Sequence, residues 1–168
     1  MDEKRQIISS FIPVAVLKPM TDEACEAVPQ DLLTDGLIKV SKFPFKIGRE
    51  SRVQELEGRL LRIERPRVEG GELSNDLYLL DKGEKLNISR EHLLIEEVDG
   101  LHFAVDRGSV CGIKINGESV GGDGTSGRKE LNDGDTILIG CRSTPYIYKF
   151  ITLEDHWGKE YSRQGDSG

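Results

Sequence analysis

Two short motifs carry side chains suited to holding a phosphate group. Gly48-Arg49 follows one predicted strand, and Ser89-Arg90 precedes another about forty residues later. A dianionic phosphate is bound by charge-assisted hydrogen bonds from donors on rigid loops. Arg49 offers a planar guanidinium, Ser89 a hydroxyl and Arg90 a second cation, while Gly48 allows a close backbone turn. The motifs therefore predict a phosphate site formed by Arg49, Ser89 and Arg90.

These motifs belong to a longer ordered series. It continues with Ser89-Arg90-Glu91-His92, Asp106-Arg107-Gly108-Ser109-Val110-Cys111-Gly112, Asn116-Gly117, Leu131-Asn132-Asp133-Gly134-Asp135 and Ile137-Leu138-Ile139-Gly140. The order resembles the forkhead-associated (FHA) domain, whose pattern runs G-R, S-R-x-H, D-x-x-S-x-N-G-T-x-x-N-G and L-x-x-G-D-x-I-x-I-G. The resemblance implies an all-β antiparallel sandwich of about eleven strands that binds phosphothreonine peptides through loops at one end, without catalysis. It also implies that His92 braces its loop by hydrogen bonding and does not touch the ligand.

The sequence departs from the family pattern where the ligand peptide would lie. Cys111 stands where the family has an Asn that commonly bonds the ligand backbone, and Val110 stands where a hydroxyl often helps to hold phosphate. Ile113 replaces the Thr of the pattern. Because a thiol is a weak donor and Val has none, contact with the residues flanking the phosphothreonine is weakened.

Ser109, Val110 and Cys111 are the predicted peptide contacts, and Asn116 is a further one. A shifted alignment would make Asn116-Gly117 the ligand-side pair, but the spacing from Asp106 and Ser109 favours the first alignment.

Hydrophobic periodicity predicts strands along most of the chain. Apolar residues alternate with polar ones over Leu101–Asp106 and Ile113–Ile115, and in Tyr146–Ile151 large apolar residues on both faces predict a strand covered on both sides. Further predicted strands are Phe11–Leu17, Leu37–Ile47, Leu77–Leu80, Leu93–Val98 and Thr136–Ile139. Asp99-Gly100 between two of these strands predicts a tight hairpin. Many short strands with turn signals between them indicate a sandwich or barrel.

The segment near residues 53–75 interrupts this pattern as an insertion. The apolar residues of Val53–Ile63 sit nearer to helical spacing, which predicts a short helix or an irregular excursion. Residues 39–67 hold nine Lys/Arg and four Glu, a local charge of +5. The insertion carries four arginines, Arg59, Arg62, Arg65 and Arg67. It is either an auxiliary surface for ligand specificity or an addition without a role in binding.

Three parts of the chain are predicted. Residues 1–36 form an N-terminal strand and linker that pack on the domain or lead into it, and residues 37–153 form the FHA-like domain. Residues 154–168 form a polar, flexible tail.

Composition excludes several classes of function. A net charge of −7 argues against non-specific nucleic-acid binding, and no apolar run reaches the length of a membrane span, so no membrane insertion is expected. Cys25, Cys111 and Cys141 show no metal spacing, which predicts three reduced thiols in a cytoplasmic protein without metal or cofactor. The Gly-rich run at 121–129 lacks the Lys-Ser/Thr of a nucleotide-binding loop and predicts a flexible hairpin loop instead.

The sequence thus predicts a recognition module, not an enzyme. Its expected ligand is a phosphothreonine segment of a partner protein in Ser/Thr-kinase signalling. Loss of the family residues at Val110 and Cys111 keeps open a phosphate-independent scaffold or assembly component of a larger complex. A nucleotide-using enzyme built on residues 121–129 is the remaining and weakest alternative.

Overall fold

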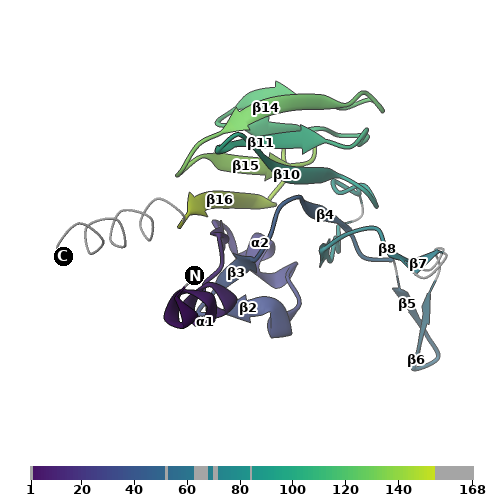
Figure 1. The fold of residues 1–168 in the computed structure, drawn as a ribbon. Helices are drawn as coiled ribbons and strands as arrows, with labels where there is room; N and C mark the ends of the chain where they lie inside the picture. The colour runs from purple at the N-terminus through teal and green to yellow at the C-terminus, as the bar shows by residue number, and fades with distance from the viewer. Residues whose placement is uncertain (1, 52, 63–67, 70–71, 84, 154–168) are drawn as a thin grey trace, which may run out of the picture.

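Alternating apolar residues place one face of each strand in a core shared by two sheets. The computed structural model describes residues 2–51, 53–62, 68–69, 72–83 and 85–153. One sheet has seven strands in the order β13 (Glu118–Val120), β12 (Ile113–Ile115), β15 (Thr136–Ile139), β16 (Ile147–Thr152), β1 (Ala15–Pro19), β3 (Leu37–Val40) and β2 (Leu33–Thr34). The other has five, in the order β14 (Gly127–Leu131), β11 (Leu101–Asp106), β10 (Leu93–Val98), β4 (Phe45–Arg49) and β9 (Leu77–Leu79). The predicted all-β sandwich is confirmed (Figure 1).

The core lies between the two sheets. Leu93 and Ile95 of β10 and Ile115 and Phe150 of the opposite sheet are all fully buried. Each such side chain contributes about 1.5–3 kcal/mol when it leaves water. The remaining strands add further buried side chains, and α2 (Asp22–Glu26) adds Ala24.

The hairpin at Asp99-Gly100 positions the site. Both residues have positive φ, 52° and 78°, as a tight two-residue turn requires. The turn sets the register between β10 and β11, so that Leu93 pairs with Asp106. Because β10 begins and β11 ends at this pair, the segments that precede Leu93 and follow Asp106 leave the sheet at the same end.

Two predicted strands are wrong. Leu37–Ile47 is not one strand but two, since β3 and β4 belong to different sheets. Pro44, which follows a cis peptide bond, has no N–H to donate to a sheet, and the chain crosses between the layers here. Phe11 ends a helix, α1 (Glu3–Phe11), and the strand begins only at Ala15.

The N-terminal segment contains helices that the periodicity did not reveal. Asp2 caps α1 by accepting a hydrogen bond from the Lys4 amide at 3.2 Å, and Thr21 caps α2 in the same way from the Ala24 amide at 3.0 Å. A 3₁₀ turn, Gln30–Leu32, follows. β1 lies within the seven-stranded sheet, between β16 and β3.

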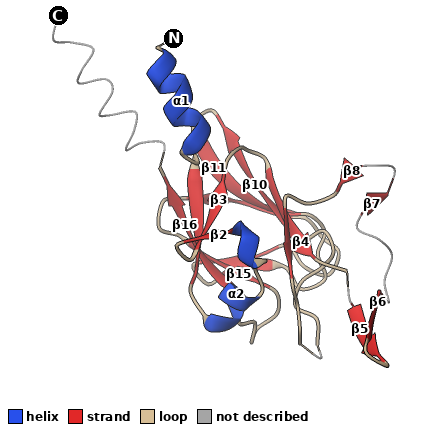
Figure 2. Cartoon of the chain, turned by 90° about the horizontal axis from the view of Figure 1, so that it is seen from below, coloured by secondary structure: helices blue, strands red, loops and turns tan. Residues whose placement is uncertain are grey.

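The insertion is built from short strands rather than a helix. β5 (Val53–Leu56) pairs with β6 (Arg59–Arg62), and β7 (Val68–Glu69) pairs with β8 (Glu72–Leu73). The turn between β5 and β6 has positive φ at both central residues, Glu57 and Gly58, which closes a hairpin and prevents a helix. Figures 1 and 2 show β5 to β8 projecting from the sandwich beside β4. Residues 63–67, with two of the four arginines, and the tail at 154–168 lie outside the described residues.

Among the described helices, none combines the length and the apolar character of a membrane span. In the same part of the chain, no group of three or more potential metal ligands comes together.

Candidate functional site

Three segments meet where β4 ends, β10 begins and β11 ends. They are the end of β4 at Arg49, the serine loop (residues 85–92) and the recognition loop (residues 107–112). The Arg49 amide donates to the Ser89 carbonyl at 3.0 Å, and the Arg107 amide donates to the His92 carbonyl at 2.8 Å. These backbone bonds fix the predicted phosphate-binding residues side by side.

Arg49 is held by backbone carbonyls of its neighbours. Its side chain is largely buried, its Nε donates to the Ile88 carbonyl at 2.9 Å, and its Nη1 lies 3.5 Å from the Glu50 carbonyl. A guanidinium has five N–H donors in a rigid plane. The Nε bond therefore fixes the plane of this cation beside the backbone of Ser89.

Gly48 is required by a close approach of the serine loop. A Cβ at this position would lie 2.0 Å from the Arg90 carbonyl oxygen and 2.5 Å from Asn75 Nδ2. Asn75 Nδ2 donates to the Arg90 carbonyl at 2.8 Å, and Asn75 Oδ1 accepts from Arg107 Nη1 at 2.7 Å. Asn75 and Arg107 thus brace the backbone of Arg90. Sequence reasoning missed both residues, although Arg107 lies inside the Asp106–Gly112 motif.

The Ser89 hydroxyl accepts a hydrogen bond from the recognition loop. The Val110 amide donates to Ser89 Oγ at 3.0 Å. Because the hydroxyl accepts this bond, its own O–H remains to donate. Among the described residues, none accepts a hydrogen bond from that O–H.

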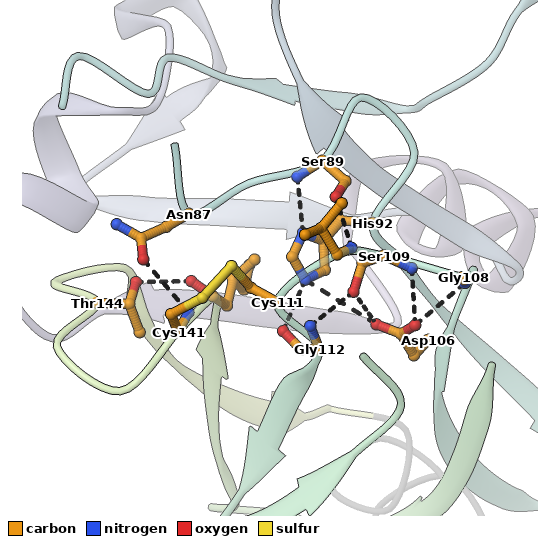
Figure 3. Close-up of polar contacts among 12 residues, drawn as sticks. Asn87, Ser89, His92, Asp106, Gly108, Ser109, Cys111, Gly112, Cys141 and Thr144 are labelled. Carbon is orange, nitrogen blue, oxygen red and sulfur yellow. Dashed lines mark hydrogen bonds and ion pairs between the residues drawn. A yellow bond between two sulfur atoms is a disulfide. The ribbon is translucent and has the colours of Figure 1, made fainter. Parts of the chain in front are cut away.

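His92 joins the two loops from below. It is fully buried, its Nδ1 accepts from the Ser89 amide at 2.9 Å, and its Nε2 lies 2.8 Å from the Gly112 carbonyl (Figure 3). These partners require a neutral ring with the proton on Nε2. Burial lowers the pKa of His92, although the Gly112 carbonyl and the Asp106 carboxylate raise it in part.

A buried carboxylate shapes the recognition loop. Asp106 Oδ1 accepts from the Gly108 and Ser109 amides at 3.0 and 2.9 Å, and Asp106 Oδ2 accepts from Ser109 Oγ at 2.5 Å (Figure 3). Ser109 Oγ in turn accepts from the Gly112 amide at 2.8 Å. Ser109 is buried, and its side chain is directed into the loop.

The Gly-rich segment packs against the recognition loop. The Asp123 amide donates to the Val110 carbonyl at 2.8 Å, and the Gly124 amide donates to the Ser109 carbonyl at 3.0 Å. A Cβ at Gly121 would lie 2.5 Å from the Asp106 side chain. The segment joins β13 and β14, edge strands of different sheets, and supports the loop.

The comparisons with known proteins point to one family. The FHA-domain family model matches residues 58–140. The chain contains an FHA domain.

Solved FHA structures are similar to this chain at low sequence identity, and the first of those below shares its fold. An engineered FHA domain with a Myc-pTBD peptide is 15% identical, with a TM-score of 0.50, over 88% of this chain and 98% of that chain. The FHA domain of CT664 from Chlamydia trachomatis is 15% identical, with a TM-score of 0.48, over 83% and 97%. Mycobacterium tuberculosis EmbR, in complex with a low-affinity phosphopeptide, is 19% identical, with a TM-score of 0.47, over 83% of this chain and only 24% of EmbR. The comparison with curated proteins finds no match.

In this FHA domain the prediction of three reduced thiols is wrong. Cys111 and Cys141 form a disulfide with their Cα atoms 4.9 Å apart, and Cys25 alone remains free. The two cysteines are 30 residues apart in sequence, so spacing gave no hint of the pair. Cys111 lies two residues before Ile113 of β12, and Cys141 lies two residues after Ile139 of β15. Ile113 and Ile139 are paired in the sheet. Only the register of β12 against β15 brings them together.

The structure places Asn116 away from the other predicted site residues. It lies in the turn after β12, at the end opposite the recognition loop. Its Nδ2 donates to Asp135 Oδ1 at 2.8 Å, and its Oδ1 accepts from the Thr136 amide at 3.0 Å. Its side chain therefore orders a turn at the far end of the sandwich.

Proposed function

We propose that this FHA domain binds phosphothreonine segments of partner proteins. Arg49, Ser89 and Arg90 hold the phosphate, while Gly48 and His92 support the loops that carry them. The observation that carries the proposal is the Ser89 hydroxyl, which accepts from the Val110 amide and keeps its O–H to donate, while Arg49 Nε is held by the carbonyl of the preceding residue, Ile88. The family match supports the same ligand, because phosphothreonine peptides are what the resemblance to FHA domains implies.

The donor set is strong enough for a useful affinity. A hydrogen bond that involves a charged group contributes about 1.5–3 kcal/mol. Two or three such bonds account for a large part of the roughly −8 kcal/mol that corresponds to a micromolar dissociation constant. The phosphate therefore dominates binding, and the flanking residues of the ligand adjust it.

The peptide around the phosphate meets a surface unlike the family pattern. Val110 is 72% exposed, and its backbone amide lies 3.0 Å from Ser89 Oγ, so its side chain borders the phosphate site. Cys111 is part of a disulfide and has no thiol proton to donate. We propose that Val110 and Cys111 make apolar contacts to the ligand where the family Asn would bond its backbone.

The domain acts as a recognition module in Ser/Thr-kinase signalling and not as an enzyme. Its site is a set of hydrogen-bond donors on rigid loops, which suits the binding of a phosphorylated segment. The cytoplasmic location stays a prediction. In a reducing compartment the disulfide is expected to form and break with the redox state and not to persist.

Binding to an oriented phosphothreonine peptide library tests the proposal, with the unphosphorylated library as the reference. Arg49→Ala is expected to remove phosphate-dependent binding. Arg128→Ala is the matched control, because this arginine lies on β14 and stacks on Phe103, with its Cζ atom 3.7 Å from the ring centre. Equal binding of both libraries, or an Arg49→Ala variant as active as the control, would contradict the proposal.

The second candidate is a phosphate-independent assembly component. The exposed apolar side chain of Val110 and the missing donor at Cys111 favour it. A partner that binds equally well with and without phosphate would establish this function instead.

A further inference from the structure

A covalent link joins two loops beside the proposed phosphate site. Cys111 lies in the recognition loop, and Cys141 lies in the bridge loop (residues 140–146), which follows β15. We propose that the Cys111–Cys141 disulfide positions the recognition loop for its ligand, so that reduction of the bridge weakens phosphopeptide binding. The inference rests on the proposed function and adds a dependence on thiol redox state.

Both ends of the bridge contact the structure around Ser89. On one side, Cys111 follows Val110, whose amide donates to Ser89 Oγ at 3.0 Å. On the other side, the Cys141 amide donates to Asn87 Oδ1 at 3.3 Å, two residues before Ser89 (Figure 3). Cutting the bridge therefore removes one constraint from the recognition loop on one side of the serine loop and from the bridge loop on the other.

The sulfur of Cys111 also packs on the serine loop directly. It lies 4.0 Å from the Leu86 carbonyl oxygen. Because a disulfide sulfur carries no hydrogen, this is a van der Waals contact and not a hydrogen bond. The bridge thus contacts a loop to which neither of its cysteines belongs.

Other bonds keep the loops attached after reduction. The Gly140 amide donates to the Gly112 carbonyl at 3.1 Å, and the Asp123 amide still holds the Val110 carbonyl at 2.8 Å. The sandwich therefore stays intact, and the recognition loop is loosened rather than released. We expect a loss of roughly tenfold in affinity, the size expected when one hydrogen bond to the ligand is no longer held in place.

The bridge is accessible to a dithiol reductant. Cys141 is exposed and Cys111 is partly exposed. Two electrons and two protons from the dithiol break the S–S bond and form two thiols, while the dithiol closes to its own disulfide. Cys25, in α2, takes no part and supplies the control.

The test uses the full chain and a fluorescent phosphothreonine peptide selected from the oriented library. Its affinity is measured before and after treatment with dithiothreitol, with the unphosphorylated peptide in parallel. Titration of free thiols should give one before reduction and three afterwards. The Cys111→Ser/Cys141→Ser double variant should bind like the reduced protein and ignore dithiothreitol, whereas Cys25→Ser should keep the full response.

A local readout separates positioning of the site from general stability. On reduction of the folded wild-type protein, the amide resonances of Ser89 and Val110 should shift, while those of β1 and β3 should not. This measurement needs no variant, so poor folding of the double variant would not prevent the test.

The outcomes distinguish this inference from the proposed function. Phosphate-dependent binding that is equal in both redox states, tighter binding after reduction, or three free thiols before reduction would each overturn the inference and leave the proposed function intact. Absence of phosphate-dependent binding in both states would overturn the proposed function and the inference together.

Discussion

Asp106 is the residue whose replacement should reveal most about how the site is held. It is fully buried and accepts three hydrogen bonds, from the Gly108 amide, the Ser109 amide and the Ser109 hydroxyl. The substitution Asp106→Asn keeps the shape and one carbonyl oxygen. It removes the charge and turns an amide NH₂ toward the Ser109 hydroxyl.

The magnitude follows from these three bonds. The two backbone amides lose the charge-assisted part of their bonds, about 1 kcal/mol each, and the Ser109 hydroxyl loses its acceptor, about 1–3 kcal/mol. Relief from burying a carboxylate offsets part of this loss. We expect the free energy of unfolding to fall by about 2 kcal/mol and the phosphopeptide affinity to fall with it, because the recognition loop that places Val110 against Ser89 is held less firmly.

Urea unfolding at pH 7.5 measures the first effect, and peptide binding to the folded variant measures the second. Asp135→Asn is the matched control. Asp135 also accepts two hydrogen bonds in a turn, from Asn116 Nδ2 and the Asn132 amide, but at the end of the sandwich away from the site. It should change stability by less than about 1 kcal/mol and leave binding unchanged, since its bonds are exposed. An Asp106→Asn variant as stable and as active as this control would refute the reasoning.

Three further perturbations test separate features. Gly48→Ala should destabilise the domain by about 1–3 kcal/mol and weaken phosphopeptide binding, because its Cβ would lie 2.0 Å from the Arg90 carbonyl oxygen; an unchanged urea midpoint would show that the backbone relaxes freely. Acidification should destabilise the protein as the pH falls below about 6.5, because burial lowers the pKa of His92 and the unfolded chain binds the proton first. His92→Gln should flatten that pH dependence of the urea midpoint, and a slope unchanged in this variant would contradict the assignment. Reduction of Cys111–Cys141 should lower the free energy of unfolding by about 3–4 kcal/mol, the loop-closure entropy for a separation of 30 residues; equal urea midpoints with and without dithiothreitol would count against it.

Local chemistry in the sequence was enough for the fold class and for locating the motifs that the structure brings together at the candidate site. The period-two patterns of Leu101–Asp106 and Ile113–Ile115 depend only on which side chains prefer water, so they predicted strands correctly. The Asp99-Gly100 hairpin was predicted because positive φ is a property of those two residues. The motif order likewise pointed to the FHA family, because each motif is a short stretch with its own turn chemistry.

What failed were predictions that depend on distant parts of the chain. Periodicity predicts one extended segment over residues 37–47, but it does not show that β3 ends at Val40 in one sheet and that β4 begins at Phe45 in the other. The helical spacing in residues 53–63 was overridden by a turn with positive φ at Glu57 and Gly58. Intrinsic spacing is a weak preference, and a turn or a sheet partner outweighs it.

The contacts that hold the candidate site were decided by tertiary structure alone. Asn75 reaches Arg90 across the sheet, and Ser109 is directed inward by Asp106. Cys111 meets Cys141 only because β12 lies beside β15 in one particular register. The sequence determined which side chains are able to donate to a phosphate, since that is a property of each residue type. The fold decided which of them share one end of the sandwich, because strand pairing and register bring together residues that are distant along the chain.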